Sequence, residues 1–328
     1  MNATLSRRSV LAMGAALPLA GCGAGEPLTA SRTPRLDMDR LNRETARIAE
    51  AIAPARLGMG LMNLESGEHF SFAGDQRFPL AGTVVLPLAA AVLAEVEAGR
   101  LTGKERLTLD EGQLSPPPSK ISATWPARRD YAVDELLAAA VLGDSTAADV
   151  LMKRIGGPGA VTAWLDAKRV DGVRVDRYAR ELLVERHGLP SFRPAWRTEG
   201  VFAEAIARQP QGTRLAALKR YMADPRDTAT PSGMLEFLSL LGGGQLIARP
   251  TARDLLRTLR RENGRAHILS IARPDLGLTP AMADVGVFIL PERRAYALAV
   301  FVTGASLDGA GRGRLMSDLT ALARSSVG

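Results

Sequence analysis

Apolar residues recur at helical spacing near the start of the chain and alternate with polar residues soon afterwards. Residues 37–53 show the helical spacing, which predicts an amphipathic helix. Residues 57–64 and 68–73 are strand-like and are separated by a Ser-Gly turn, so they predict a hairpin. The end of the chain mirrors this order, with strand-like residues 285–290 and 296–303 before a helical pattern over 314–323.

The middle of the chain has helical patterns. Residues 86–96 are apolar on all sides, as expected of a helix that is buried all round. Residues 133–142 and 146–155 are periodic, and Ser145 is the predicted N-cap of the second of these helices, with Gly156 as its stop. Strand-rich ends around a helical centre predict a mixed α/β (α+β) fold, in which an antiparallel sheet is flanked by the terminal helices beside an all-helical lobe.

The first residues resemble a lipoprotein signal. Residues 6–11, Ser-Arg-Arg-Ser-Val-Leu, resemble a twin-arginine export motif, and the following apolar run is too short to span a bilayer. Residues 19–22, Leu-Ala-Gly-Cys, resemble a lipobox, which implies lipid attachment at Cys22. Residues 1–21 are therefore expected to be removed, leaving an exported protein held on a membrane. Gly23 after that cysteine favours the outer membrane if the organism has two.

Charge and composition exclude several classes of protein. The net charge of +7 becomes +5 when residues 1–21 are removed, because they hold two arginines and no acidic residue. The sequence has no basic block with interleaved aromatic residues, so nucleic acid is not an expected partner. Cys22 is the only cysteine, and His69, His187 and His267 lack metal-ligand spacing. We expect a monomer with no metal and no cofactor, whose partners are an envelope protein or a small anionic ligand.

Six fragments resemble one enzyme family in the same order. Residues 77–101, beginning Arg-Phe-Pro, resemble the segment around the active-site helix of class A serine β-lactamases. The other fragments are residues 56–67, 142–149 with 155–158, 176–182, 227–231 and 283–288. The resemblance implies a class A β-lactamase-like fold, with an α/β lobe over residues 37–78 and 245–328 and a helical lobe over 79–244. Residues 22–36, small and polar with two prolines, predict a tether to this domain.

The family's nucleophile and its lysine partner are missing. The resemblance places the Ser and Lys of the Ser-x-x-Lys motif on Gly82 and Val85. Neither side chain can attack a carbonyl or accept a proton. Thr83 is one step along the helix and is expected to point away from the vacant position, because each step rotates a side chain by about 100°.

The remaining family positions are also changed. The Ser and Asn of the second motif fall on Gly143 and Ser145, and only Asp144 between them matches. The general-base Glu of the omega loop falls on Ala179, and the Asn near it falls on Leu183. These replacements predict a pseudoenzyme that binds in the cell envelope.

One basic residue matches in charge. The third motif, Lys-Thr-Gly, falls on residues 273–275 if the register is carried back from Asp284 without a gap. Arg273 would then keep the positive charge of the motif's lysine, which in the family helps to hold the substrate's carboxylate. Asp144 and Arg273 are therefore the candidate ligand-binding residues.

Two alternatives stay open. The chain is an active serine hydrolase if a nucleophile outside the Ser-x-x-Lys motif acts, and Ser145 is the candidate, although a helical pattern rather than a strand precedes it. Ser115 and Ser119 lie among prolines and are expected to have loop roles. Alternatively, the chain is a purely structural surface lipoprotein, as the apolar replacements favour. The extended omega-loop region, residues 176–230, includes an insertion. A surface insertion without a function of its own is the first expectation, and a lid over the pocket or a docking site for a protein partner is the sharper alternative.

Overall fold

The structure, a computed structural model, describes residues 35–258, 269–273, 278–290 and 294–327. Its largest sheet has five antiparallel strands in the order β2-β1-β9-β8-β7. Strand β1 pairs with β2 on one side and with β9, from the other end of the chain, on the other. The strands are β1 (Arg56–Asn63), β2 (His69–Phe72), β7 (Leu269–Arg273), β8 (Leu278–Ile289) and β9 (Ala295–Thr303).

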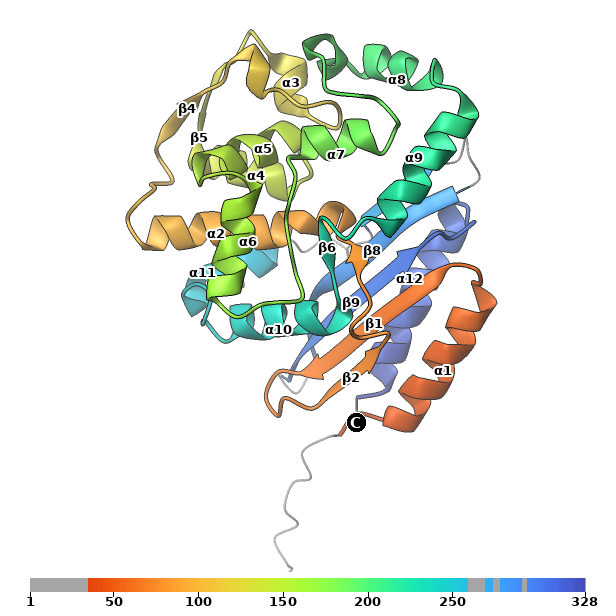
Figure 1. The fold of residues 1–328 in the computed structure, drawn as a ribbon. Coiled ribbons are helices and arrows are strands. Elements are labelled where there is room, and N and C mark those ends of the chain that lie inside the picture. The colour runs from red at the N-terminus through yellow and green to blue at the C-terminus, as the bar shows by residue number, and fades with distance from the viewer. Residues whose placement is uncertain (1–34, 259–268, 274–277, 291–293, 328) are drawn as a thin grey trace, which may run out of the picture. The chain divides into compact units, whose positions relative to one another are not determined.

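Helices cover both faces of this sheet (Figure 1). The terminal helices α1 (Met38–Ala51) and α12 (Gly309–Ser325) pack together on one face, and α10 (Pro231–Gly242) packs on the other against β1 and β9. The close approach of α10 requires small residues on β1. A Cβ added at Gly60 would lie 2.8 Å from the Leu235 side chain of α10, so glycine is needed there.

The helical lobe is built around α2 (Val85–Glu97), in which every residue from Val85 to Val92 is buried. A short 3₁₀ turn, η1 (Ala81–Val84), leads into it. The surrounding helices are α3 (Lys120–Thr124), α4 (Val133–Val141), α5 (Ser145–Arg154), α6 (Pro158–Ala167) and α11 (Arg249–Thr258). Their apolar side chains and those of α10 form one continuous core with α2.

The insertion within the omega-loop region is helical. It contains α7 (Ala179–Glu185), η3 (Pro194–Arg197), α8 (Glu199–Ala207) and α9 (Gln211–Ala223). Val184, Leu189, Trp196 and Phe202 form a separate apolar cluster within it. Arg197 ties this segment to the helical lobe, because its Nη1 donates a hydrogen bond to the Trp125 carbonyl at 3.2 Å and its guanidinium lies over the Trp125 ring.

The predicted fold class is confirmed, and most predicted elements lie within a few residues of their expected bounds. Two details differ. The helical lobe also contains two small sheets, which pair β3 (Phe78–Pro79) with β6 (Thr228–Ala229) and β4 (Arg106–Thr108) with β5 (Asp130–Ala132). Such short pairings depend on contacts between distant residues, which periodicity does not reveal.

The second difference concerns the start of α5. Ser145 was the predicted N-cap, but Asp144 takes this place and Ser145 is the first helical residue. The Asp144 carboxylate accepts a hydrogen bond from the backbone N–H of Ala147 at 3.0 Å. Either residue type suits the position, so the choice between them depends on the chain path before the helix.

Candidate functional site: a pocket without its reactive groups

Six positions that the sequence comparison assigned to the catalytic machinery lie around one pocket. Its volume is about 320 Å³, and it lies between η1, α5 and α7. Its walls include all six of them: Gly82, Val85, Gly143, Ser145, Ala179 and Leu183.

The rest of the wall is mainly apolar. Side chains from α4, α5 and the omega-loop region complete it, including Ala140, Ala148, Met152 and Leu182. Val85 and Leu183 are 7% and 6% exposed, so both are largely withdrawn from solvent. The pocket therefore presents hydrocarbon at the places where proton-transfer groups would be needed.

The chain enters this wall in a strained conformation. Ala81, immediately before Gly82, has a φ of 51°, a value that non-glycine residues seldom adopt. The next side chain is not available for chemistry, because the Thr83 hydroxyl is buried and donates a hydrogen bond to the Leu80 carbonyl at 2.6 Å. Thr83 thus stabilises the η1 turn.

Ser145 lines the pocket, but its hydroxyl hydrogen is engaged elsewhere. Its Oγ lies 2.7 Å from the Pro116 carbonyl oxygen and 3.0 Å from that of Pro118, and it donates to them. A nucleophilic serine needs a base that accepts its proton. Backbone carbonyls cannot take up a proton at neutral pH, so this geometry fixes the loop before α3 and does not activate Ser145.

Asp144, the candidate ligand-binding residue of the second motif, is also surrounded by local donors. Besides capping α5, its carboxylate accepts hydrogen bonds from Ser119 Oγ at 2.8 Å and from the Ile121 backbone N–H at 3.1 Å. Ser119 therefore has the loop role predicted for it. With three donors in place, the Asp144 carboxylate joins the start of α5 to α3.

A second carboxylate, which the sequence analysis did not single out, connects this region to the omega loop. Asp149 accepts a hydrogen bond from Ser115 Oγ at 2.6 Å and from the backbone N–H groups of Ala179 and Arg180 at 2.5 and 3.0 Å. It thereby caps the first turn of α7. Burial raises the pKa of the Asp149 carboxyl to about 6, although the three hydrogen bonds oppose this shift. The only sequence signal was an acidic residue between apolar neighbours in a helical pattern.

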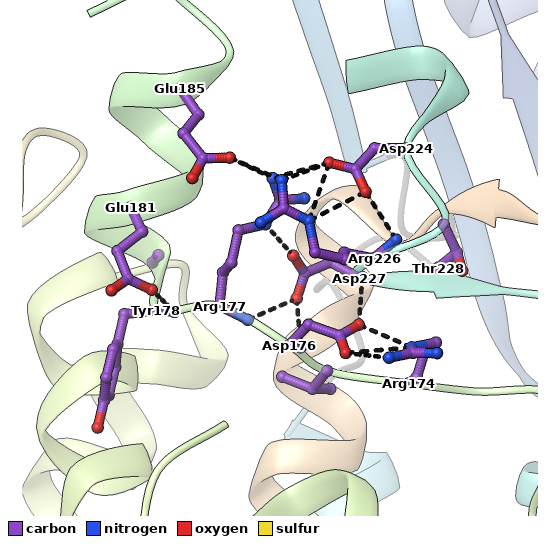
Figure 2. A network of polar contacts seen from close by, with 12 residues as sticks. Arg174, Asp176, Arg177, Tyr178, Glu181, Glu185, Asp224, Arg226, Asp227 and Thr228 are labelled. Atoms are coloured by element: carbon purple, nitrogen blue, oxygen red, sulfur yellow. Dashed lines mark hydrogen bonds and ion pairs between the residues drawn. The ribbon is translucent and has the colours of Figure 1, made fainter. Parts of the chain in front are cut away.

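The base of the insertion is held by a buried arginine (Figure 2). Arg177 Nε lies 2.6 Å from Asp227 Oδ2, and its Nη1 contacts Glu185 at 2.5 Å and Asp224 at 3.1 Å. Burial alone would lower the pKa of the Arg177 guanidinium, but its hydrogen bond to Asp227 and the surrounding carboxylates raise that pKa. Arg177 and Asp227 also line the pocket, so its polar end is an ion pair already formed.

Some predicted functional residues lie partly or wholly outside the residues that the structure describes. Cys22 and the signal fall before the described residues. The backbone of Arg273 pairs with Leu278 at the end of β7, but its side chain and residues 274–275 fall outside the described parts. Among the described residues, no group of three His, Cys, Asp or Glu side chains is arranged to hold a metal ion.

Comparison with known proteins agrees with this architecture. The antiparallel sheet and the helices around it have the fold of class A β-lactamases. A family model described as the β-lactamase enzyme family matches residues 40–326, so the chain belongs to that family.

Two solved structures illustrate the shared fold. A β-lactamase from Chitinophaga pinensis DSM 2588 superposes with a TM-score of 0.65 at 22% identity, covering 86% of this chain and 97% of that one. The ancestral class A β-lactamase of Gram-negative bacteria gives a TM-score of 0.65 at 23% identity, covering 87% of this chain and 99% of that one. At these identities the likeness concerns the fold alone.

A sequence relative covers a shorter stretch. The β-lactamase CARB-4 of Pseudomonas aeruginosa is 27% identical over 139 residues, which are 42% of this chain. The match spans 48% of that relative, about half its length.

Proposed function

We propose that this chain is a non-catalytic member of the β-lactamase family that binds a ligand in the former catalytic pocket. The observation that carries the proposal is the joint placement of Gly82, Val85 and Ala179 on one pocket wall. The resemblance assigns to these positions the attacking group, its proton acceptor and the group that activates water. All three roles must be filled for a full acylation and deacylation cycle.

The described wall offers no replacement nucleophile with a base. Ser145 donates its proton to carbonyl oxygens, and the Asp144 carboxylate is engaged by three other donors. In another hydrolase, removal of the catalytic triad lowers the rate by about a million-fold. The loss of several such groups supports a protein without turnover.

The surviving cavity favours binding over a purely structural role. A protein that kept only its scaffold has no requirement for a pocket of about 320 Å³. That volume falls within the range of ordinary small-molecule sites, on the order of 300–1,000 Å³. The hydrogen bonds that hold α7 over the pocket, from Ala179 and Arg180 to Asp149, support the same view.

The proposed location is the cell envelope, through a lipid on Cys22. No helix among the described residues is long and apolar enough to cross a bilayer. Exchange of Cys22 for alanine should release the protein from membranes with its thermal transition unchanged. Membrane fractionation and intact mass test this, and unchanged fractionation without a lipid mass would refute the anchor.

The test of the non-catalytic assignment is exposure of the purified chain to a fluorescent penicillin. Denaturing electrophoresis and intact mass should show no penicilloyl adduct, and a chromogenic cephalosporin should not be hydrolysed. An active class A β-lactamase serves as the positive control. Saturable turnover that survives both further purification and Ser145→Ala would overturn the proposal and reveal an unrecognised nucleophile.

A further inference from the structure

The walls of the former catalytic pocket specify which kind of molecule it can hold. Its lining is dominated by side chains without hydrogen-bonding groups, contributed by η1, α2, α4, α5 and α7. The apolar lining residues include Val84, Val85, Ala140, Ala148, Met152, Ala179, Leu182 and Leu183. Such a wall favours a ligand by removing apolar surface from water, by about 25 cal/mol for each Å² buried.

The charged residues of the lining already make polar contacts within the protein, and one buried donor, Nη2 of Arg177, has no hydrogen-bond partner among the described residues. Arg177 is neutralised by Asp227, Glu185 and Asp224, and Asp144 accepts hydrogen bonds from three donors. Arg186 also takes part in interactions with its surroundings, including a contact of its Nε with His187 Nε2 at 3.4 Å.

An anionic ligand would therefore meet an Arg177 whose charge is already matched by carboxylates. It would have to lose its hydration while lying near Asp144 and Asp227, both of which line the pocket. Burial of a charge without a new partner is strongly unfavourable. An uncharged ligand avoids this penalty and still gains from the apolar wall.

The size of the pocket limits the ligand further. Its volume is about 320 Å³, and an apolar cavity of about 150 Å³ in another protein accommodates benzene. One or two rings, or an aliphatic body of similar size, match this space.

We propose that the pocket between η1, α5 and α7 binds an uncharged, predominantly apolar small molecule of one or two ring equivalents. This inference rests on the proposed non-catalytic function and specifies its ligand. It differs from the sequence-based expectation of a small anionic ligand.

The test uses two fluorescent probes that differ by one charged group. 1-Aminonaphthalene is uncharged at neutral pH and has two rings, and 8-aminonaphthalene-1-sulfonate carries the same two rings with a sulfonate. The full-length protein is titrated with each. A half-buried residue on the wall is then enlarged by Ala179→Trp, and Ala138→Trp, on the exposed side of α4, is the matched control.

The uncharged probe should bind wild type and Ala138→Trp saturably and alike. Ala179→Trp should weaken that binding by at least about tenfold, because the indole takes up the space that the probe would fill. Any binding of the anionic probe should be the same in wild type and in Ala179→Trp. A cooperative thermal transition verifies folding, and Ala148→Met fills the pocket from α5 if Ala179→Trp does not fold.

Each other result counts against a specific part of the proposal. Absence of saturable binding of the uncharged probe, or binding that pocket-filling variants do not affect, overturns the assigned ligand class and leaves the non-catalytic function standing. Equal loss of both probes in Ala179→Trp overturns the selection against charge. A penicilloyl adduct would instead overturn the proposed function, whatever the probes show.

Discussion

The wall of the pocket is mainly apolar, whereas the clusters around Asp149 and Arg177 beside it are polar. Both are formed by the same elements of the chain. Ala179 contributes its methyl group to an apolar wall, while its backbone N–H donates to Asp149. Leu183 faces the pocket from α7, while Glu185 of the same helix pairs with Arg177. The same elements thus present apolar side chains to the pocket and use polar groups to hold the backbone in place.

Two kinds of polar group can be distinguished: catalytic groups, which act on a substrate, and structural groups, which join segments of the chain. Catalytic groups are held ready for a substrate and often reduce the stability of the fold. Polar groups that join segments distant in sequence are different, because removal of one leaves a buried partner unsatisfied. In a protein without turnover, as proposed here, only the first kind of group would be dispensable.

The largest expected effect comes from breaking the ion pair at the base of the insertion. Arg177→Met should lower the free energy of unfolding by about 3–5 kcal/mol, because it leaves buried Asp227 without its charged partner. Denaturant titration measures this change. The matched control is Arg208→Met, whose pair with Glu204 is exposed and should contribute about 0.5 kcal/mol. Equal effects of the two changes would contradict the structural role of Arg177.

The cluster around Asp149 should make the stability of the protein depend on pH. Because the folded pKa of Asp149 is about 6 and the unfolded value is about 3.9, the folded state favours the protonated carboxyl. Its contribution to stability is therefore greatest below about pH 4 and falls by about 3 kcal/mol as the pH rises through 6.

Asp149→Asn should abolish this component of the pH dependence. Denaturant titrations of wild type and variant at several pH values isolate it, since the other carboxyl groups titrate in both proteins. The amide can still accept the Ala179 N–H. Parallel stability curves between about pH 4 and 6 would show that Asp149 titrates normally in the fold.

Restoration of the first motif should affect stability without restoring the cycle. Gly82→Ser with Val85→Lys places an amine at a position that is 7% exposed, which should lower stability by about 2 kcal/mol. Without a carboxylate at residue 179, any acyl-enzyme should persist, so at most slow adduct formation is expected. Intact mass and cephalosporin hydrolysis distinguish these outcomes, and multiple turnover would contradict the assigned role of position 179.

The smallest expected change in stability comes from removal of a buried hydroxyl group in the insertion. Tyr221 on α9 packs against Ala81 and Ala281, and its buried hydroxyl has no hydrogen-bond partner in the described structure. Burial also raises the pKa of this phenol. Tyr221→Phe should therefore stabilise the protein by about 1 kcal/mol. A loss of stability in thermal and denaturant unfolding would show that the hydroxyl has a partner.

The insertion shows where sequence patterns stop being informative. Its helix α9 spans Gln211–Ala223, and a helical element of this length is a local feature of the chain. The cluster of Trp196 and Phe202 was not foreseen, because its members are joined by packing and not by a periodic spacing. Whether the segment acts as a lid or a docking surface remains a prediction.

By itself, the sequence determined the elements whose signals are local and the identity of the side chains at the family positions. Helix α2 was predictable because continuous apolar character over a helical length signals full burial. The hairpin of β1 and β2 was predictable from two apolar stretches around a Ser-Gly turn.

Only the tertiary structure decided how the polar residues are used. Arg177 and Asp227 are separated by 50 positions along the chain, and Asp149 reaches Ala179 across 30. Their partners depend on how helices and loops fold back on one another, which no local period records. The same long-range packing places Gly82, Val85 and Ala179 on a single pocket wall, turning separate substitutions into one apolar site.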